Sequence, residues 1–152
     1  GISMNLKLRQ NGNWEFESGV QACRDILKSG YPVKAIYAMN DLMALGAIRQ
    51  IRDFGLQVPD DIGVIGFDDS EYGWFSNPAL TTVHVPLDEI GRESAAALIT
   101  KIEHGVLEKK RILLECICII TSNSCFFNTN YYNKYYFNDI YLSKHCKTKI
   151  QL

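Results

Sequence analysis

The sequence predicts an α/β domain in which helices flank a parallel sheet. Segments whose apolar residues recur every three or four positions, typical of helices with one buried face, alternate with short and almost wholly apolar segments. Segments of the second kind are typical of parallel strands covered by helices on both faces. With 152 residues, 47% of them hydrophobic, the chain is long enough to bury a core of its own.

The first half of the chain predicts a helix, a strand and a second helix. Residues 16–29 carry apolar side chains three and four positions apart, and Gly30 marks the end of this helix. The run VKAIYAM, residues 33–39, has the composition of a buried strand. Residues 41–54 return to helical spacing, and Gly55 suits the position just after a helix.

The second half continues the alternation. The run IGVIGF, residues 62–67, predicts a second strand, followed by an acidic and aromatic loop over residues 68–78. The run TTVHV, residues 81–85, predicts a third strand. A helix should then start at Pro86, because proline suits the first turn of a helix, and end at Gly105. Residues 112–120 form the last predicted strand.

Composition changes sharply after Cys125. Residues 126–152 are dominated by Asn, Tyr, Phe and Lys and show no sustained period of two or 3.6 residues. We therefore expect a folded domain over residues 1–125 and a disordered or irregular tail over residues 126–152. The alternative is an ordered extra pair of strands, since Tyr and Phe favour strands.

Charge and hydropathy point to no nucleic-acid or membrane partner. The chain has 16 basic and 17 acidic residues, so no net positive charge attracts it to DNA or to an anionic membrane. No apolar run approaches the roughly 20 residues that span a bilayer, and no signal peptide is recognisable. A cytoplasmic location is the default expectation.

The five cysteines lack the paired spacing of a zinc site and are interpreted as reduced thiols. The best alternative is a metal site formed by Cys116, Cys118, His145 and Cys146, but we expect no metal and no cofactor. Catalytic motifs are missing too: the sequence has no GxSxG, GxxxxGK[ST], GxGxxG or HExxH. We therefore expect no enzyme.

Polar residues follow the first two predicted strands, where α/β sheets bind ligands. Asn40 and Asp41 follow the first strand, and Asp68 and Asp69 follow the second, directly after Phe67. Amide and carboxylate groups are suited to bind the hydroxyls of a sugar or another polyol. The alternatives are that Asn40 only caps its helix and that Asp69 only shapes a turn.

Aromatic residues near these positions could contribute to a ligand cleft. Trp14 could stack on the apolar face of a sugar ring, or it could belong to the core. Tyr72, Trp74 and Phe75 lie in the loop after the aspartates, where they could line a cleft or a subunit contact.

Several runs together resemble a known family. These are AIYAMNDLMALGAIRQIRDFGLQVPDDIGVIGFDD (residues 35–69), NPALTTVHVPLDEIGRESAAALI (residues 77–99), GNWEFESG (residues 12–19) and, more loosely, IITSNSC (residues 119–125). Their combination and order resemble the effector-binding domain of the lactose/galactose-repressor (LacI/GalR) family of bacterial transcription regulators.

The resemblance implies a type I periplasmic-binding-protein-like lobe that is incomplete, because the chain matches mainly the C-terminal lobe. Members of this family usually work as homodimers and bind operator DNA through an N-terminal helix-turn-helix, which this chain lacks. A small-molecule effector, often a sugar, binds between their two lobes. An effector-contacting arginine of the family would fall before Gly1, and Thr121 stands where an arginine is common.

Carried over by resemblance, Trp14 matches a ring-stacking aromatic, Asn40 a polar effector contact and Asp68 a carboxylate that binds effector hydroxyls. Four further residues would line the cleft or contact the residues that line it: Asp41, Phe67, Asp69 and Trp74. The main rival is a fragment of a periplasmic sugar-binding protein of a transporter, although VPDDI and PALTTV favour the regulator. A third reading is an enzyme built on the same scaffold.

Overall fold

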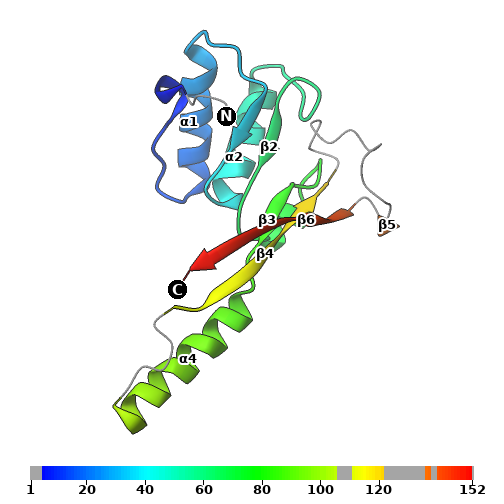
Figure 1. The fold of residues 1–152 in the computed structure, drawn as a ribbon. Helices are drawn as coiled ribbons and strands as arrows, with labels where there is room; N and C mark the ends of the chain where they lie inside the picture. Colours follow the sequence, from blue (N-terminus) through cyan, green and yellow to red (C-terminus); the bar gives the residue numbers. More distant parts are fainter. Residues whose placement is uncertain (1–4, 106–110, 122–135, 138–139, 152) are drawn as a thin grey trace.

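The computed structural model describes residues 5–105, 111–121, 136–137 and 140–151 (Figure 1). It begins with a short 3-10 helix, η1 (Leu6–Leu8), and the helix α1 (Phe16–Lys28). The strand β1 (Ala35–Tyr37), the helix α2 (Asp41–Asp53) and the strand β2 (Gly63–Ile65) follow. These elements confirm the predicted order of the first half, with shorter strands than the sequence suggested.

The helices α1 and α2 pack closely against each other because two glycines leave room for it. A Cβ atom on Gly19 would lie 2.2 Å from the backbone oxygen of Met43, and one on Gly46 would lie 2.2 Å from that of Phe16. Cys23 of α1 and Ile51 of α2 are almost fully buried between the elements of this half. The backbones of the two helices therefore approach each other without intervening side chains.

The strands β1 and β2 form the predicted parallel pair, with Tyr37 opposite Ile65. Two single parallel bridges, Ile65 to Thr81 and Asp68 to His84, place the chain around β3 (Thr82–His84) beside the end of β2. The short helix α3 (Glu71–Trp74) interrupts the loop that the sequence predicted as irregular. The carboxyl ends of β1 and β2 therefore open at the same edge of the sheet.

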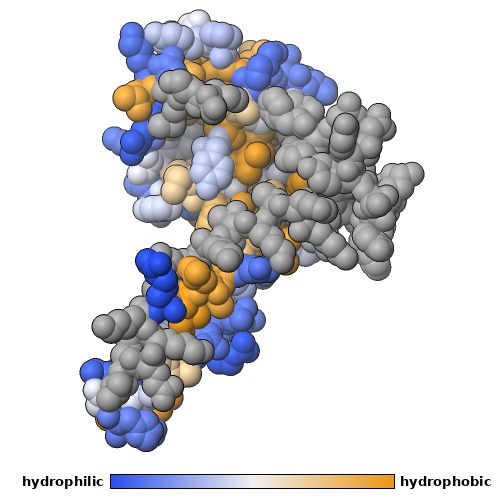
Figure 2. Space-filling model, viewed as in Figure 1, coloured by the Kyte–Doolittle hydropathy of each residue, from blue (hydrophilic) through white to orange (hydrophobic). Residues whose placement is uncertain are grey.

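The last part of the domain differs from the prediction. The helix α4 (Leu87–His104) has no buried residue and runs away from the sheet instead of covering it (Figure 1). Its apolar side chains lie on the surface (Figure 2). Ile102, for example, is 73% exposed. Because α4 does not cross over the sheet, the chain returns in the opposite direction, and β4 (Leu113–Ile120) pairs antiparallel with β3.

Part of the expected tail has a regular backbone. The strand β6 (Ile140–Gln151) pairs antiparallel with β4, and β5 (Tyr136–Phe137) pairs with β6. The division into a domain over residues 1–125 and a tail over residues 126–152 stays a prediction. Residues 122–135 lie outside the described residues.

Candidate functional site

The predicted ligand-binding residues lie together at the edge of the sheet where β1 and β2 end. Asn40 caps α2 and Asp41 is its first residue, shortly after the end of β1, and Asp68 and Asp69 follow β2. A hydrogen bond of 2.6 Å from the backbone N–H of Ser70 to Oδ2 of Asp41 joins the two segments. The structure thus brings the two predicted polar pairs into one neighbourhood.

Asn40 caps α2, as the alternative interpretation proposed, and it also holds Trp14. Its Oδ1 accepts a hydrogen bond of 2.9 Å from the backbone N–H of Met43. Its Nδ2 donates to the backbone oxygen of Trp14 at 2.8 Å, and the residue is only 9% exposed. The side chain therefore fixes the start of α2 relative to the segment that carries the tryptophan.

Trp14 does not belong to the core. The residue is 59% exposed and has a φ of 72°, a left-handed conformation that is uncommon for a non-glycine residue. It lines a cavity of about 630 Å³ between the N-terminal segment, α1 and β1. Exposed side chains of Tyr37 and Met39, at the end of β1, line the same cavity. The cavity therefore presents an aromatic and apolar rim at the edge of the sheet where β1 ends.

Cys23 lies in the floor of this cavity and is nearly inaccessible. Burial raises the pKa of its thiol to about 12, so the reactive thiolate is scarcely populated at neutral pH. Cys116 and Cys118 of the metal alternative are buried, whereas the side chains of His145 and Cys146 lie outside the described residues. Among the described residues, no group of three potential metal ligands occurs.

Asp68 presents its carboxylate at the surface. The residue is exposed and has a φ of 110°, and its backbone N–H is bonded to the oxygen of Val83 at 3.0 Å. Partial desolvation and the negative charge of Asp41 raise the pKa of its carboxyl group. Partial desolvation and the charge of Asp68 in turn raise the pKa of the Tyr37 hydroxyl. Asp68 and Tyr37 therefore lie close enough to influence each other at the end of the sheet.

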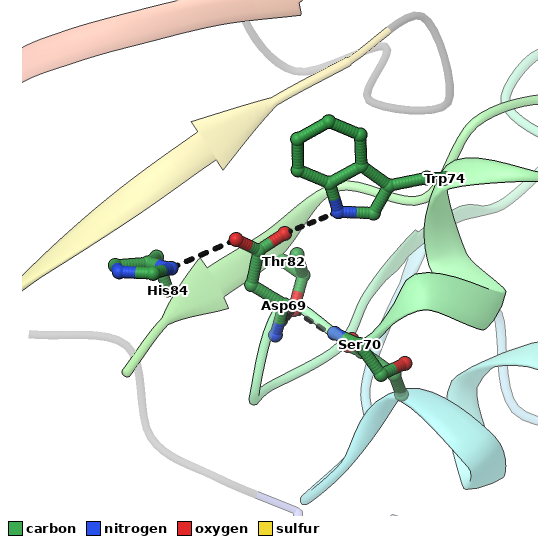
Figure 3. A network of polar contacts seen from close by, with 6 residues as sticks. Asp69, Ser70, Trp74, Thr82 and His84 are labelled. Atoms are coloured by element: carbon green, nitrogen blue, oxygen red, sulfur yellow. Dashed lines mark hydrogen bonds and ion pairs between the residues drawn. The ribbon is translucent and has the colours of Figure 1, made fainter. Parts of the chain in front are cut away.

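Asp69 is occupied by the protein itself. Its side chain is only 7% exposed, and its two oxygens accept hydrogen bonds from the indole Nε1 of Trp74 at 2.7 Å and from Nδ1 of His84 at 2.8 Å (Figure 3). The indole ring of Trp74 stays largely exposed, but its N–H group is used. Both carboxylate oxygens of Asp69 therefore have partners within the protein.

Asp41 is buried behind this turn. It is 1% exposed, and its Oδ1 accepts a hydrogen bond of 2.5 Å from the hydroxyl of Thr82. Burial raises the pKa of its carboxyl group, although the hydrogen bonds from Thr82 and Ser70 lower it. Gly66 provides the space, since a Cβ atom there would lie 2.3 Å from Oδ1 of Asp41. Phe67, next to this glycine, is half-buried.

Several residues at this edge were not found from the sequence, notably Tyr37, Ser70 and Thr82. Tyr37 is exposed at the end of β1, but the almost wholly apolar run VKAIYAM has no alternation of polar and apolar residues that would have singled it out. Thr82 offers no signal either, because it meets Asp41 across 41 residues of sequence.

Comparison with known proteins places this arrangement in a family. Residues 4–125 match the model of the periplasmic binding protein-like domain. The HTH-type transcriptional regulator CelR of Thermobifida fusca is 36% identical over 115 residues, which cover 76% of this chain and 34% of that protein. The ribose operon repressor of Escherichia coli strain K12 is 40% identical over 114 residues, which cover 75% of this chain and 34% of the repressor.

A solved structure, the complex of the transcriptional regulator CelR with cellobiose, superposes with a TM-score of 0.77 at 33% sequence identity. The superposition covers 81% of this chain and 38% of that structure. The chain thus spans about a third of the length of the relatives that it matches. It belongs to the periplasmic binding protein-like domain family, and it is similar to transcriptional regulators, one of which is a sugar-binding regulator of the LacI family from Escherichia coli.

Proposed function

We propose that this chain is the ligand-sensing part of a bacterial LacI-type transcription regulator whose effector is a sugar or a similar small polar molecule. The exposed carboxylate of Asp68 at the ligand-binding edge of the sheet carries the proposal. The two neighbouring acidic side chains, Asp41 and Asp69, are both buried and both occupied by hydrogen bonds within the protein. Asp68 is therefore the carboxylate of this cluster that is offered to a ligand.

Trp14 and Asn40 complete the proposed site. The exposed ring of Trp14 supplies a flat apolar surface for a sugar ring, and Asn40 fixes the backbone that carries it. An ionised carboxylate accepts hydrogen bonds from sugar hydroxyls. This combination of a stacking ring and a charged acceptor fits a polyol better than it fits an apolar ligand. The relative CelR was solved as a complex with cellobiose, which is a molecule of this class.

The remaining properties of the whole regulator follow as proposals. We infer a cytoplasmic homodimer that binds operator DNA through a helix-turn-helix outside this chain, with the effector changing its operator affinity. The relatives are named as transcriptional regulators, which favours this function over a transport protein and over an enzyme. Among the described residues, none of the helices is long and apolar enough to cross a membrane.

Nuclear magnetic resonance titration tests the proposed site on the chain itself. The ¹⁵N-labelled chain is titrated with cellobiose and, separately, with D-ribose, a method that detects weak binding. We expect saturable shifts of the indole signal of Trp14 and the amide signal of Asp68, with the exposed helix α4 as an internal control. Saturable shifts confined to α4, or none with either sugar and a further panel of mono- and disaccharides, would contradict the proposed site.

A further inference from the structure

We propose that Asp41 is a positioning residue, whose buried side chain holds the turn over residues 68–70 in the conformation that presents Asp68 to ligand. This inference rests on the proposed function of Asp68. Four features of the structure support it: the backbone of the turn, the hydrogen bonds that hold the turn, the position of Asp41 at the start of α2, and the cost of burying a carboxylate at this place.

The backbone of the turn needs outside support. Asp68 and Asp69 are consecutive non-glycine residues with positive φ angles, 110° and 60°. Side chains with a Cβ atom disfavour such angles, so a residue keeps them only where surrounding contacts hold it. A turn with two such residues in sequence would relax to another conformation if those contacts were lost, and the Asp68 carboxylate would then move.

Besides the bond from the Asp68 N–H to the oxygen of Val83 and the side-chain bonds of Asp69, the turn is held by Asp41. Its Oδ2 accepts the backbone N–H of Ser70 at 2.6 Å, and its Oδ1 accepts the hydroxyl of Thr82 at 2.5 Å. The oxygen of that hydroxyl in turn accepts the backbone N–H of Asp69 at 3.3 Å (Figure 3). Two successive backbone amides of the turn, those of Asp69 and Ser70, are thus fixed by Asp41, one directly and one through Thr82.

The position of Asp41 also links the two sides of the proposed site. Asp41 is the first residue of α2, directly after Asn40, whose side chain binds the backbone of Trp14. The start of this helix therefore holds the Trp14 segment through Asn40 and the Asp68 turn through Asp41. Ring and carboxylate are kept at a constant separation, which is what recognition of one ligand by both requires.

A carboxylate is suited to this role even though its burial is unfavourable. Asp41 is 1% exposed, and burial raises the pKa of its carboxyl group. An amide would be easier to bury, but it has only one acceptor oxygen, whereas both oxygens of Asp41 face donors. With Asp41→Asn, either the Ser70 N–H loses its acceptor or the Thr82 hydroxyl must turn and accept instead. The charged group therefore serves the geometry of the turn rather than the stability of the fold.

The test compares Asp41→Asn and Thr82→Val with Asp53→Asn as a matched control. Asp53 lies at the other end of the same helix in an exposed ion pair with Arg49. Three quantities are measured by NMR in each variant: hydrogen exchange of the Asp69 amide, hydrogen exchange of the Ser70 amide, and the pKa of the Asp68 carboxyl group. The melting temperature of each variant is measured in parallel.

We expect Asp41→Asn to melt within a few degrees of the unchanged chain while Ser70 exchanges about tenfold faster or more, as expected when a hydrogen bond of about 1.4 kcal/mol is lost. The pKa of Asp68 should fall, because the neighbouring negative charge is removed. Thr82→Val should accelerate exchange of the Asp69 amide, and Asp53→Asn should change none of these quantities. Should Asp41→Asn fail to fold, Thr82→Val decides the outcome alone.

Unchanged exchange at Asp69 and Ser70, with a lowered melting temperature as the sole effect, would overturn the proposal and leave Asp41 as a packing residue. The same samples are titrated with cellobiose and D-ribose. If the turn responds as expected but the unchanged chain binds neither sugar, the positioning of the turn stands and the proposed function fails. If the unchanged chain binds and Asp41→Asn binds equally well, the positioning role fails and the proposed function stands.

Discussion

At the scale of single residues, three neighbouring carboxylates have three different environments. Asp41 is buried behind the turn, Asp69 is enclosed within it, and Asp68 is exposed on it. The environments follow from the donors that each carboxylate meets: a backbone amide and a hydroxyl for Asp41, an indole and an imidazole for Asp69. We therefore expect substitutions of the three residues to affect different properties of the protein.

Replacing Asp69 should lower stability. In Asp69→Asn one of the two acceptor oxygens becomes an NH₂ group, so either the Trp74 indole or the His84 ring loses its charged partner. A lost hydrogen bond to a charged group costs about 1.5–3 kcal/mol, and the exposure of Trp74 and His84 favours the lower end. Urea unfolding followed by tryptophan fluorescence measures this loss. An unchanged unfolding midpoint would show that the network in Figure 3 contributes nothing to stability.

The buried carboxyl group of Asp41 predicts a pH dependence. Burial raises its pKa in the folded protein above the value of 3.8 of an exposed carboxyl group, so the folded state binds more protons than the unfolded state just above pH 3.8. The contribution of Asp41 to stability is therefore largest below pH 3.8 and is lost as pH rises through the folded pKa. Unfolding experiments between pH 4 and pH 7 should show a flatter pH dependence for Asp41→Asn than for the unchanged chain. A steeper pH dependence of stability in Asp41→Asn would contradict the raised pKa of Asp41 in the folded protein.

At the scale of elements, the contact between α1 and α2 depends on its glycines. Gly46→Ala would place a methyl group 2.2 Å from the backbone oxygen of Phe16, which cannot move without shifting α1. Overpacking of this kind costs typically about 1–3 kcal/mol. Gly91→Ala is the matched control, because its Cβ would meet nothing within 4 Å in α4, and it should stabilise by about 0.5–1 kcal/mol. Thermal unfolding of both variants checks the pair; equal effects would show that α1 and α2 do not pack as described.

The elements were predictable where the local pattern decides them. Helical spacing over residues 16–29 and 41–54 located α1 and α2 within one residue at each end. The path of the chain after β3 was not predictable in this way, because the apolar spacing of α4 is the same whether the helix covers a sheet or projects from it. The antiparallel direction of β4 depends on that path, and periodicity carries no information about direction.

The candidate site was predictable to the same extent: the local pattern located its residues but did not decide their roles. Asn40, Asp41, Asp68 and Asp69 could be located because each directly follows a recognisable strand. Their separate roles could not, because the partners that decide those roles are distant in sequence: Thr82 for Asp41, and His84 for Asp69. Such tertiary contacts occupy the side chain of Asp69 within the turn, whereas Asp68 stays exposed.

At the scale of the whole molecule, charge predicts weak interaction with DNA. Because the chain has 16 basic and 17 acidic residues, its binding would release few counterions from the phosphate backbone of DNA. We therefore expect neither strong nor strongly salt-dependent binding. In a gel-shift assay with operator-like DNA, the chain should bind no better than a neutral globular protein does. Sequence-selective binding that weakens steeply with salt would show that this chain carries a DNA-binding surface of its own.

The central claim is that the chain senses a polyol through Asp68, and a comparison of sugar affinities tests it most directly. The unchanged chain and Asp68→Asn are titrated with cellobiose and D-ribose, with a melting curve of each to check folding. The amide keeps the shape of the side chain but replaces a charged acceptor, so affinity for the sugar that binds should fall about tenfold to a hundredfold at an unchanged melting temperature. Equal affinities of the two proteins for that sugar would contradict the claim and place the ligand elsewhere.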